Sequence, residues 1–336
     1  MRQFELRRAA SVQDAVLLGA AASTAQQGAE VRYLAGGTTL LDLMKLDVEH
    51  PRHVVQLAPL GLDRIEALPD GGLSIGALVR NSDLAHDERV RRGYPVLSEA
   101  LLSGASAQLR NMATTAGNLL QRTRCVYFRD AAMACNKRAP GSGCDAMAGY
   151  HRNLAILGTS AHCIATNPSD MNAALAVLEP CVHVTGLHGA REIPFSKFHL
   201  VPGDTPHIET TLQPGDLVTH LTLPALPDGT RSGYLKLRDR ASYEFALASC
   251  AVVLAVEGGV VERIRIGLGG VATRPWRAIE AEHALTGKPL SRQGVEAAAV
   301  AALRDARPLA GNAFKVELAR RAIVQAIGNV AGEALR

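Results

Sequence analysis

The sequence predicts an α+β protein of two or three domains, and three observations lead to this fold class. The chain has 336 residues, long enough to bury a sizeable core in more than one domain. Hydrophobic residues make up 47% of it and charged residues 20%, which is typical of a globular protein. Helical and strand-like patterns alternate near the start, whereas strand pairs and Ala-rich helices dominate the last part of the chain.

Composition excludes several functions. The formal net charge of +4 is small and scattered, and aromatic residues make up only 4%, so no nucleic-acid partner is expected. No apolar run approaches the roughly 18 residues that a membrane-spanning helix needs. The start of the chain reads as an amphipathic helix, because its acid and arginines stand in the wrong order for a signal peptide. The chain is therefore expected to have neither an export signal nor a membrane anchor of its own.

The first two units mix helices with strands. The first unit is predicted to contain a helix over 11–27, a strand over 30–34, the turn "AGGTT", a helix over 40–45 and the strand "HVVQLA". A hairpin follows in "IEALPDGGLSIGALV", with its turn at Asp70, Gly71 and Gly72. The next predicted elements are helices over 82–92, over 94–103 and in "DMNAALAVL", and strands in "CVHVTG" and "REIPFSKF".

A domain boundary is expected in "LTLPALPDGTRSGY", near residues 224–233. Two prolines and a Pro-Asp-Gly turn interrupt the regular patterns there. Beyond it, "ALASCAVVLAV" and "VERIRIGLGGVA" predict two strands that are joined at Gly258 and Gly259. Helices are expected from Arg277 to the end of the chain.

Two glycine–threonine turns are candidates for binding an anion. The turn in "YLAGGTTLLDLMK" consists of Gly36, Gly37, Thr38 and Thr39. The turn in "RNMATTAGNLL" contains Thr114, Thr115, Gly117 and Asn118. Such turns can point several backbone N–H groups and hydroxyls at one ligand. Neither a G-x-G-x-x-G nor a G-x-x-x-x-G-K-[ST] motif is present, so each turn alone is more often a plain turn, but together they favour a diphosphate-bearing cofactor.

Four of the six cysteines lie in the loop-rich segment 121–169. They are Cys125, Cys135, Cys144 and Cys163. Their spacing lacks the close pair of a typical zinc site and the usual ferredoxin runs, yet four thiolates match a cubane cluster. Arginines and lysines in the same segment are expected to favour thiolates. An iron–sulfur cluster, a zinc site that includes histidines and a mobile loop with reduced thiols all remain open. The other two cysteines, Cys181 and Cys250, are expected to be buried structural thiols.

At this point the sequence resembles a known family. The stretches "YLAGGTTLLDLMK", "LRNMATTAGNLLQR" and "NPSDMNAALAVL" together resemble the FAD-binding subunit of the molybdenum hydroxylases, the family of xanthine dehydrogenase, carbon monoxide dehydrogenase and aldehyde oxidoreductase. The resemblance continues through "KLRDRASYEFALAS" and "RIGLGGVATRPWRA". The cysteine segment is similar to that of the flavin subunit of bacterial periplasmic aldehyde oxidoreductase, which carries an extra [4Fe-4S] cluster.

The resemblance implies a fold in three parts. It predicts a PCMH-type FAD-binding fold of two α/β lobes, followed by an α+β domain like that of the carbon monoxide dehydrogenase flavoprotein. The expected ranges are 1–60 for the first lobe, 61–226 for the second lobe with the iron–sulfur insert at 121–169, and 230–336 for the C-terminal domain. FAD is expected between the two lobes.

The resemblance also implies the site residues. Those expected around the FAD pyrophosphate are Ala35, Gly36, Gly37, Thr38, Thr39, Leu40, Leu41, Asp42, Thr114, Gly117 and Asn118. Asp170 is expected to contact the cofactor, and Lys236 to lie near its ring or ribose end; a helix N-cap and a solvated lysine are the plain alternatives. The four cluster ligands are expected to be Cys125, Cys135, Cys144 and Cys163. Ala116 and Glu244 depart from the family pattern, where a glycine and an aspartate are usual.

By the same resemblance, the chain transfers electrons and has no catalytic residue of its own. A large molybdopterin-cofactor subunit would oxidise an aldehyde or a heteroaromatic compound, and a small subunit with two [2Fe-2S] clusters would pass electrons to FAD and on to an external acceptor. The assembly would be a heterotrimer or its dimer. Its location stays open between the cytoplasm, since this chain has no signal of its own, and the periplasm, by co-export with a signal-bearing partner. Two other functions stay open, namely a PCMH-type flavin oxidase or dehydrogenase acting alone and a zinc-stabilised interaction protein.

Overall fold

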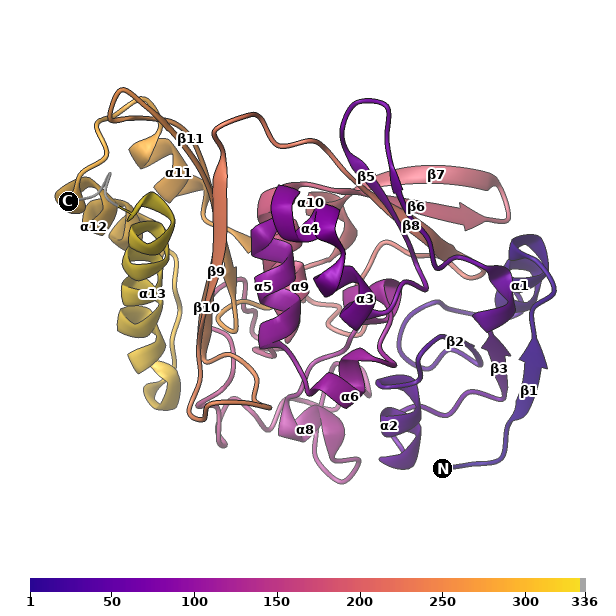
Figure 1. The fold of residues 1–336 in the computed structure, drawn as a ribbon. Coiled ribbons are helices and arrows are strands. Elements are labelled where there is room, and N and C mark those ends of the chain that lie inside the picture. Colours follow the sequence, from indigo (N-terminus) through magenta and orange to yellow (C-terminus); the bar gives the residue numbers. More distant parts are fainter. Residues whose placement is uncertain (333–336) are drawn as a thin grey trace.

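Three sheets organise residues 1–332, which are the residues that the computed structural model describes. Figure 1 shows a small sheet at the N-terminal end, a five-stranded sheet with most of the helices in the middle, and a four-stranded sheet with the C-terminal helices at the other end. Helices were expected up to the end of the chain. The last helix of the structure ends at Ala331, and the part of this prediction that falls on residues 333–336 lies outside the described residues.

The N-terminal sheet is parallel, with the strand order β1-β3-β2. Its elements are β1 (Glu5–Arg8), α1 (Val12–Gly19), β2 (Val31–Leu34), α2 (Leu40–Lys45), β3 (His53–Gln56) and the short 3-10 helix η1 (Ala58–Leu60). The helix predicted over 11–27 is too long, because α1 begins at the Ser11 cap and ends at Gly19. Beyond it, Ser23 bonds the Glu30 carboxylate and thus holds the chain in a loop.

The five-stranded sheet is antiparallel, in the order β4-β5-β8-β6-β7. Its strands are β4 (Ile65–Ala67), β5 (Leu73–Gly76), β6 (Cys181–Gly186), β7 (Gly189–Pro194) and β8 (Leu217–Leu223). The predicted hairpin is confirmed, and the Asp70 carboxylate accepts the N–H of Gly72 in its turn at 2.9 Å. The strand predicted in "REIPFSKF" is right only up to Pro194, because Phe195 starts a short helix.

Eight helices of the described chain belong to this middle part. They are α3 (Asn81–His86), α4 (Glu88–Gly93), α5 (Pro95–Ser103), α6 (Ala107–Arg110), α7 (Thr115–Leu119), α8 (Val126–Arg129), α9 (Asp170–Leu178) and α10 (Phe195–Phe198). The helix predicted over 82–92 is divided in two, because Asp87 leaves the helical conformation and its carboxylate caps α4 through the N–H of Arg89. The helix predicted at Asp170 is confirmed, with Ser169 as its cap.

The cysteine segment 121–169 is irregular apart from α8. One isolated antiparallel bridge joins Cys135 to Cys144, and positive φ angles of 84° at Gly141 and 97° at Gly143 allow the turn between them. A parallel bridge between Leu157 and Ala272 ties the segment to the C-terminal part. Sequence reasoning predicted an irregular segment here, and the structure has one.

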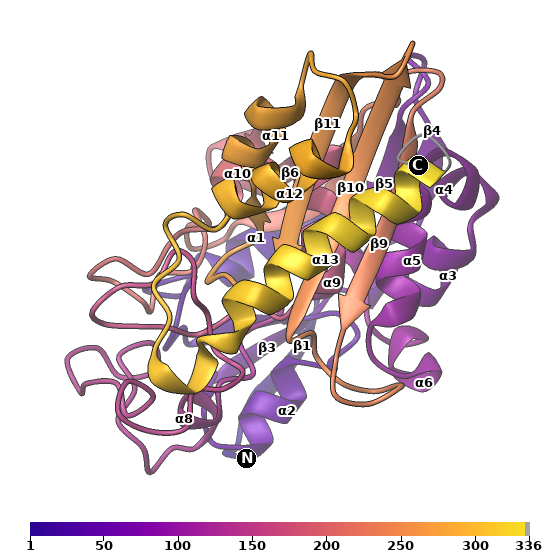
Figure 2. The ribbon, with the colours of Figure 1, turned by 90° about the vertical axis from the view of Figure 1, so that its left-hand side faces the viewer.

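The C-terminal sheet has the order β12-β11-β10-β9 and is antiparallel. Its elements are β9 (Arg231–Leu237), β10 (Ala248–Glu257), β11 (Val260–Gly269), β12 (Trp276–Arg277), α11 (Ile279–Leu285), α12 (Arg292–Ala301), the 3-10 helix η2 (Ala310–Asn312) and α13 (Phe314–Ala331). Figure 2 shows α13 crossing one face of this sheet. The strand pair predicted around Gly258 and Gly259 is confirmed.

Alternating side chains of β10 belong to two different cores. Cys250, Val252 and Leu254 pack with α11, α12 and α13. Ala251 and Val253 pack on the opposite face, in the core that also contains α5 and α9. The C-terminal sheet is therefore covered by helices on both faces, one set from each side of the predicted boundary.

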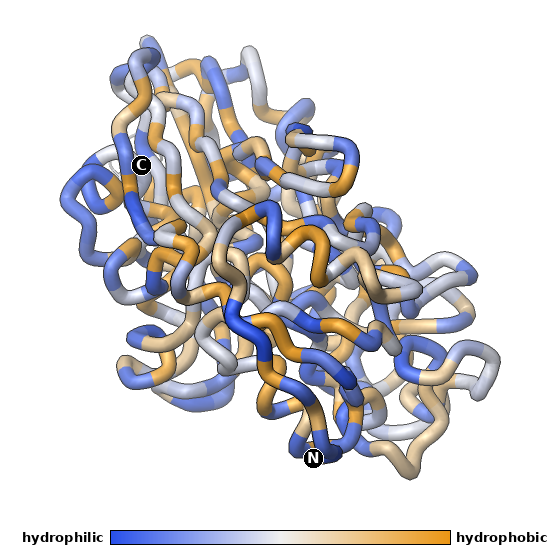
Figure 3. Tube along the Cα trace, turned by 90° about the vertical axis from the view of Figure 1, so that its right-hand side faces the viewer, coloured by the Kyte–Doolittle hydropathy of each residue, from blue (hydrophilic) through white to orange (hydrophobic). Residues whose placement is uncertain are grey.

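Polar and apolar stretches alternate along the chain on the side that carries the N-terminus (Figure 3). In β6 the alternation is regular, since every second residue is buried. Among the described residues, no helix is both long enough and apolar enough to cross a bilayer.

Candidate cofactor-binding site

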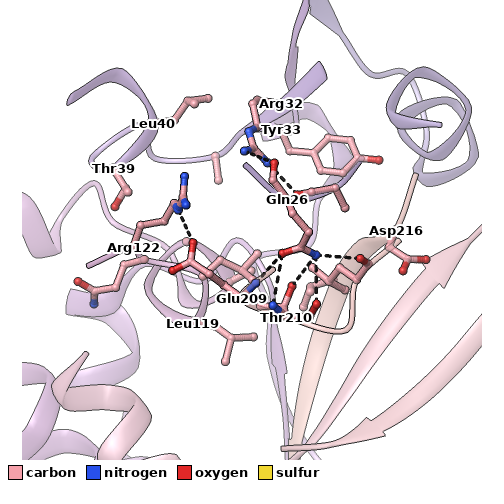
Figure 4. Close-up of a pocket in the computed structure, with 18 of the residues that line it drawn as sticks. Gln26, Arg32, Tyr33, Thr39, Leu40, Leu119, Arg122, Glu209, Thr210 and Asp216 are labelled. Carbon is pink, nitrogen blue, oxygen red and sulfur yellow. Dashed lines mark hydrogen bonds and ion pairs between the residues drawn. The ribbon is translucent and has the colours of Figure 1, made fainter. Parts of the chain in front are cut away.

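A pocket lies where the N-terminal sheet meets the middle part of the chain (Figure 4). Its lining residues come mainly from three stretches, within 19–57, 77–122 and 199–218. The first stretch contains the "AGGTT" turn and the second contains the turn around Thr114. Both predicted anion-binding turns therefore face one pocket, although about 75 residues separate them in the sequence.

The two turns also touch each other. A Cβ atom added to Gly36 would lie 1.9 Å from the carbonyl oxygen of Met112, so only a glycine allows the two backbones to approach this closely. Gly37 has a φ angle of +75°, which a residue with a side chain adopts only with strain. The sequence "AGGTT" thus needs both glycines, one for contact and one for conformation.

The turn around Thr114 is hydrogen-bonded to the segment that follows strand β5. Thr115 donates its backbone N–H to the carbonyl oxygen of Val79 at 2.8 Å, and its hydroxyl donates to the same oxygen at 3.0 Å. Thr114 caps α7, since its hydroxyl accepts the N–H of Gly117 at 3.3 Å. A Cβ added to Gly117 would meet only this hydroxyl, at 2.9 Å, so the backbone of Gly117 borders open space.

A chain of buried charges closes the pocket on one side. Arg122 pairs with Glu49 and with Glu209, each at 2.5 Å. Glu49 also binds Arg32 at 3.0 Å, and Glu209 binds Lys137 at 3.0 Å. Three cations therefore meet two carboxylates, which leaves one excess positive charge beside the pocket. Figure 4 shows Arg122 and Glu209 facing each other there.

The charge network shifts the pKa of its members. Burial alone would raise the pKa of Glu209, but Arg122 and Lys137 outweigh it and lower the pKa to about 2. Burial would lower the pKa of Arg122, but Glu209 and Glu49 outweigh it and raise the pKa. Glu209 and Arg122 are therefore both ionised at neutral pH.

Two buried nitrogens that belong to pocket-lining residues have no partner within the described chain. One is Nη2 of Arg122, a donor, and the other is Nδ1 of His199. The Nε2 atom of His199 bonds the carbonyl oxygen of Leu119 at 3.0 Å and so carries the proton, which makes Nδ1 an acceptor. Burial lowers the pKa of His199 to about 4, so its ring is neutral at pH 7. Two of the residues that line the pocket thus carry a buried, unpaired nitrogen, one a donor and one an acceptor.

Most of the residues predicted to bind the cofactor line this pocket. They are Ala35, Gly36, Gly37, Thr38, Thr39, Leu40, Thr114 and Gly117. Three of the residues predicted around the pyrophosphate are not among the lining. Leu41 packs beside Gly37, Asp42 pairs with Arg124 and Arg129, and the side-chain amide oxygen of Asn118 accepts the hydroxyl of Ser169 at 2.8 Å.

Asp170 and Lys236 lie together but outside this pocket. The ammonium of Lys236 bonds one oxygen of Asp170 at 2.8 Å, and the hydroxyl of Tyr234 donates to the other at 2.5 Å. Lys236 is buried, so it is not the solvated lysine of the plain alternative. Asp170 borders a second, smaller pocket that Glu244 also lines. Contact of these two side chains with a cofactor stays a prediction.

The four cysteines of the segment 121–169 share one cluster of packed side chains. Cys125, Cys135 and Cys163 are buried in it, and Cys144 packs against them half-buried. Cys163 also lines the pocket described above. The structure therefore brings together four thiols that are spread over 39 positions of the chain.

One backbone N–H group bonds a sulfur atom of these cysteines. The Cys163 sulfur accepts the N–H of Ala165 at 3.5 Å. N–H···S bonds of this kind are common around iron–sulfur clusters and tune their potential. The donor set, four thiols in one packed cluster, fits such a cluster.

The distances between the thiols disfavour zinc. One tetrahedral zinc ion holds its sulfur ligands about 3.8 Å apart, because each zinc–sulfur bond is about 2.3 Å long. Within residues 1–332, one group of three or more metal-binding side chains has all its donor atoms within 4.8 Å of one another, and it includes none of these four cysteines. A cubane gives each cysteine its own iron atom and spaces the sulfurs more widely.

In the chain alone, burial outweighs the effect of nearby cations on the thiols. Burial raises the pKa of Cys125 to about 11, and it raises that of Cys144 and Cys163 as well, although Lys137 acts in the opposite direction on Cys163. Most of the cations bond other acceptors instead; Arg129, for example, pairs with Asp42 at 2.6 Å. Metal binding would therefore have to displace the thiol protons.

Sequence reasoning missed the polar groups that shape the pocket. Gln26 bridges the first and the third stretch, since its amide nitrogen bonds the carbonyl oxygens of Thr210 and Leu212. Glu209 and His199 were not predicted either, and Arg122 was noted only as a charge near the cysteines. No local motif marks these residues, because their partners are far away in the sequence.

Comparison with known proteins identifies the class. The chain matches the family "FAD binding domain in molybdopterin dehydrogenase" over residues 2–226 and the family "CO dehydrogenase flavoprotein C-terminal domain" over residues 233–330. The first match spans more than half of the chain, so the protein belongs to this family. It is an FAD-binding protein of the molybdenum hydroxylase type, as the sequence predicted.

Individual relatives agree with this assignment. The aldehyde oxidoreductase FAD-binding subunit PaoB of Escherichia coli (strain K12) is 50% identical over 315 residues, which cover 94% of this chain and 96% of PaoB. The carbon monoxide dehydrogenase medium chain of Hydrogenophaga pseudoflava is 28% identical over 332 residues and covers 97% and 96%. A solved structure of carbon monoxide dehydrogenase from that organism superposes with a TM-score of 0.77 over 100% of this chain and 99% of its own. The predicted fold class is thereby confirmed.

Proposed function

We propose that the chain is the FAD-carrying electron-transfer subunit of a molybdenum-containing aldehyde oxidoreductase. The observation that carries this proposal is the meeting of the two glycine–threonine turns on one wall of a pocket. The name of the relative that is 50% identical, an aldehyde oxidoreductase subunit, supports the substrate class. A medium chain implies companions, so a large molybdopterin subunit and a small [2Fe-2S] subunit are the partners that we infer.

The residues around the pocket fit FAD. Gly37, Thr38, Thr114 and Gly117 would hold the pyrophosphate, because they supply hydroxyls and accessible backbone N–H groups to a dianion. The excess positive charge of the network around Arg122 favours a negatively charged ligand such as a pyrophosphate. When bound, FAD supplies the exchange between one-electron and two-electron transfers. The protein's part is to bind, orient and shield it.

We further propose that Cys125, Cys135, Cys144 and Cys163 hold a [4Fe-4S] cluster. The support is the donor set itself, four thiols in one packed cluster, with the N–H of Ala165 bonded to the sulfur of Cys163. Such a cluster supplies one-electron transfer, or it ties an irregular segment together. Since Cys163 also lines the pocket, the cluster and FAD would be neighbours, and electrons could leave through either group toward an external acceptor.

Flavin analysis tests the first proposal. The full chain is purified, its flavin is released by denaturation, and the amount of FAD per chain is measured by chromatography. Thr38→Val removes one hydroxyl of the pocket wall and keeps the size of the side chain, so we expect the Kd for FAD to rise about 2- to 10-fold. Thr185→Val, in the distant strand β6, is the matched control. Wild-type protein that is isolated without flavin and cannot be loaded with it would contradict the proposal.

Metal analysis of anaerobically purified protein tests the second proposal. We expect about four iron atoms and four labile sulfides per chain. Cys144→Ser should lower the iron content, whereas Cys250→Ser, a buried thiol in β10 that is remote from the cluster, should keep it. Zinc without sulfide, or unchanged iron in Cys144→Ser, would overturn the ligand set. Export to the periplasm with a signal-bearing partner remains a prediction that cell fractionation can test.

A further inference from the structure

A second group of possible metal ligands lies on the hairpin of β6 and β7. Cys181 and His183 are two positions apart in β6, so their side chains are on the same face of the sheet. His183 is the direct cross-strand partner of Glu192 in β7. Strand alternation and register alone therefore put a thiol, an imidazole and a carboxylate next to each other. Sequence reasoning expected Cys181 to be a buried core thiol, but the structure leaves it half-exposed.

The donor atoms of these three side chains converge. One ligand atom from each, the sulfur, a ring nitrogen and a carboxylate oxygen, lies within 4.8 Å of the other two. The sulfur of Cys181 is 3.7 Å from one oxygen of Glu192, and Nδ1 of His183 is 3.7 Å from the other. The donor atoms bound to one tetrahedral zinc ion lie about 3 to 4 Å apart. Small side-chain rotations would therefore bring these three donor atoms within bonding distance of one metal ion.

The ring of His183 is already oriented for this role. Its Nε2 atom bonds the hydroxyl of Thr222 at 2.9 Å, and donation from Nε2 leaves the lone pair of Nδ1 free toward Cys181 and Glu192. The ring also stacks on His220, with centroids 4.0 Å apart and an interplanar angle of 11°. Metal-binding histidines are typically held by such a partner on the other ring nitrogen.

We propose that Cys181, His183 and Glu192 form a binding site for a zinc-class divalent cation. The mixture of sulfur, nitrogen and oxygen donors suits zinc better than calcium or magnesium, which take oxygen ligands. Three protein ligands leave a fourth position for water or for a ligand from outside. Glu192 is 69% exposed, so the ion can enter from solvent.

A divalent cation at this site would displace the proton of the Cys181 thiol. None of the three residues lines the cofactor pocket, and the site depends neither on FAD nor on the proposed cluster.

Equilibrium dialysis of the full, cofactor-loaded chain against Zn²⁺ tests the proposal, with metal analysis as the readout. We expect wild-type protein to bind one zinc ion per chain more than Cys181→Ser and one more than His183→Asn. His188→Asn is the matched control, since His188 is an exposed histidine in the turn of the same hairpin. It should bind zinc like wild type, and iron content should be equal in all four proteins.

Thr222→Val gives a second, milder test. It removes the hydroxyl that orients His183 but no ligand, so zinc affinity should fall about 10- to 100-fold while the stoichiometry at saturation stays the same. Equal zinc binding by wild type and Cys181→Ser would overturn the proposal. Loss of zinc from His188→Asn would do the same, because the binding would then belong to exposed histidines in general.

Discussion

Glu209 is the residue on which the charge balance beside the pocket depends most. Its two carboxylate oxygens bind different cations, Arg122 at 2.5 Å and Lys137 at 3.0 Å. The side chains of Arg122 and Lys137 are both largely buried, so neither cation can be solvated by water if Glu209 is replaced. A buried charge that loses its partner costs far more than an exposed one.

We therefore expect Glu209→Gln to lower the free energy of unfolding by about 3 kcal/mol. Urea denaturation of the FAD-loaded chain at pH 7 measures this. The difference from wild type should shrink as the pH falls from about 4.5 to about 2, because the carboxylate of wild type is protonated in that range and loses its advantage.

Glu317→Gln is the control for this experiment. Glu317 also pairs with two arginines, Arg320 and Arg321, but it does so on the exposed surface of α13. Its replacement should leave the denaturation midpoint nearly unchanged at physiological salt. Equal effects of the two substitutions would contradict a special role for Glu209.

The sequence alone could predict the glycine–threonine turns but not this network. Each turn is a continuous stretch of sequence, and its glycines and threonines alone indicate exposed backbone N–H groups and hydroxyls. Glu49, Arg122, Lys137 and Glu209 come from three separate parts of the chain, and nothing local distinguishes them from other surface charges. Their pairing follows only once the N-terminal unit, the cysteine segment and the loop before β8 have been brought together.

The two glycine–threonine turns act as one structural element, because Gly36 lies against the backbone of Met112. Gly36→Ala would force these segments apart, at a cost of about 1 to 3 kcal/mol. We expect the variant to be isolated with much less FAD than wild type, as measured by released flavin per chain.

Gly93→Ala is suited as the comparison. Gly93 ends α4, and an added Cβ there meets nothing within 4 Å. This variant should keep its FAD. If Gly36→Ala also kept it, the close approach of the two turns would be irrelevant to flavin binding.

Helix α13 reaches the cysteine segment through a buried lysine. Lys315 donates to the carbonyl oxygen of Leu154 at 3.1 Å and to that of Gly270 at 2.7 Å. Burial lowers its pKa to about 7, and no carboxylate compensates its charge. The folded protein therefore binds one proton fewer than the unfolded chain between pH 7 and the ordinary lysine value of 10.5.

This predicts that stability rises with pH above 7. The contribution of Lys315 to the free energy of unfolding should increase by at most about 1.4 kcal/mol per pH unit. Urea denaturation at pH 7, 8 and 9 measures the slope, and Lys315→Met should remove this part of it. Lys288→Met, at an exposed lysine, should retain the wild-type slope. A slope that is the same in both variants would show that other groups cause it.

At the level of elements, the sequence predicted most strands and the helices at Asp170 and beyond Arg277. Its errors have a common cause, which is side-chain bonding to the backbone. Ser23 and Asp87 interrupt helical patterns that hydrophobic periodicity alone would continue. Periodicity shows which face is buried, but it does not show where a short polar side chain ends the helix.

The molecule as a whole is less divisible than its family matches suggest. Those matches meet between residues 226 and 233, yet β10 packs on α5 and α9 of the FAD-binding part through Ala251 and Val253. The boundary between the two family matches therefore does not divide the hydrophobic core, which contains residues from both sides of it. The predicted domain ranges accordingly stay predictions about the sequence.

We expect both parts to unfold in one cooperative transition. The single tryptophan, Trp276 in β12, reports on the C-terminal sheet, and release of fluorescent FAD reports on the pocket. The two signals should change at the same Tm during heating. A tryptophan transition that is separated from flavin release would show that the two parts are independent.

Cys163 and Lys137 belong to the cysteine segment and to the pocket wall at the same time. If the proposed cluster forms, biogenesis of the protein should therefore follow an order, with metal delivery first and flavin insertion second, because Cys163 of the pocket wall is fixed only once the cluster is in place. Cells that grow with scarce iron should accumulate a flavin-poor precursor, even when their supply of riboflavin is ample.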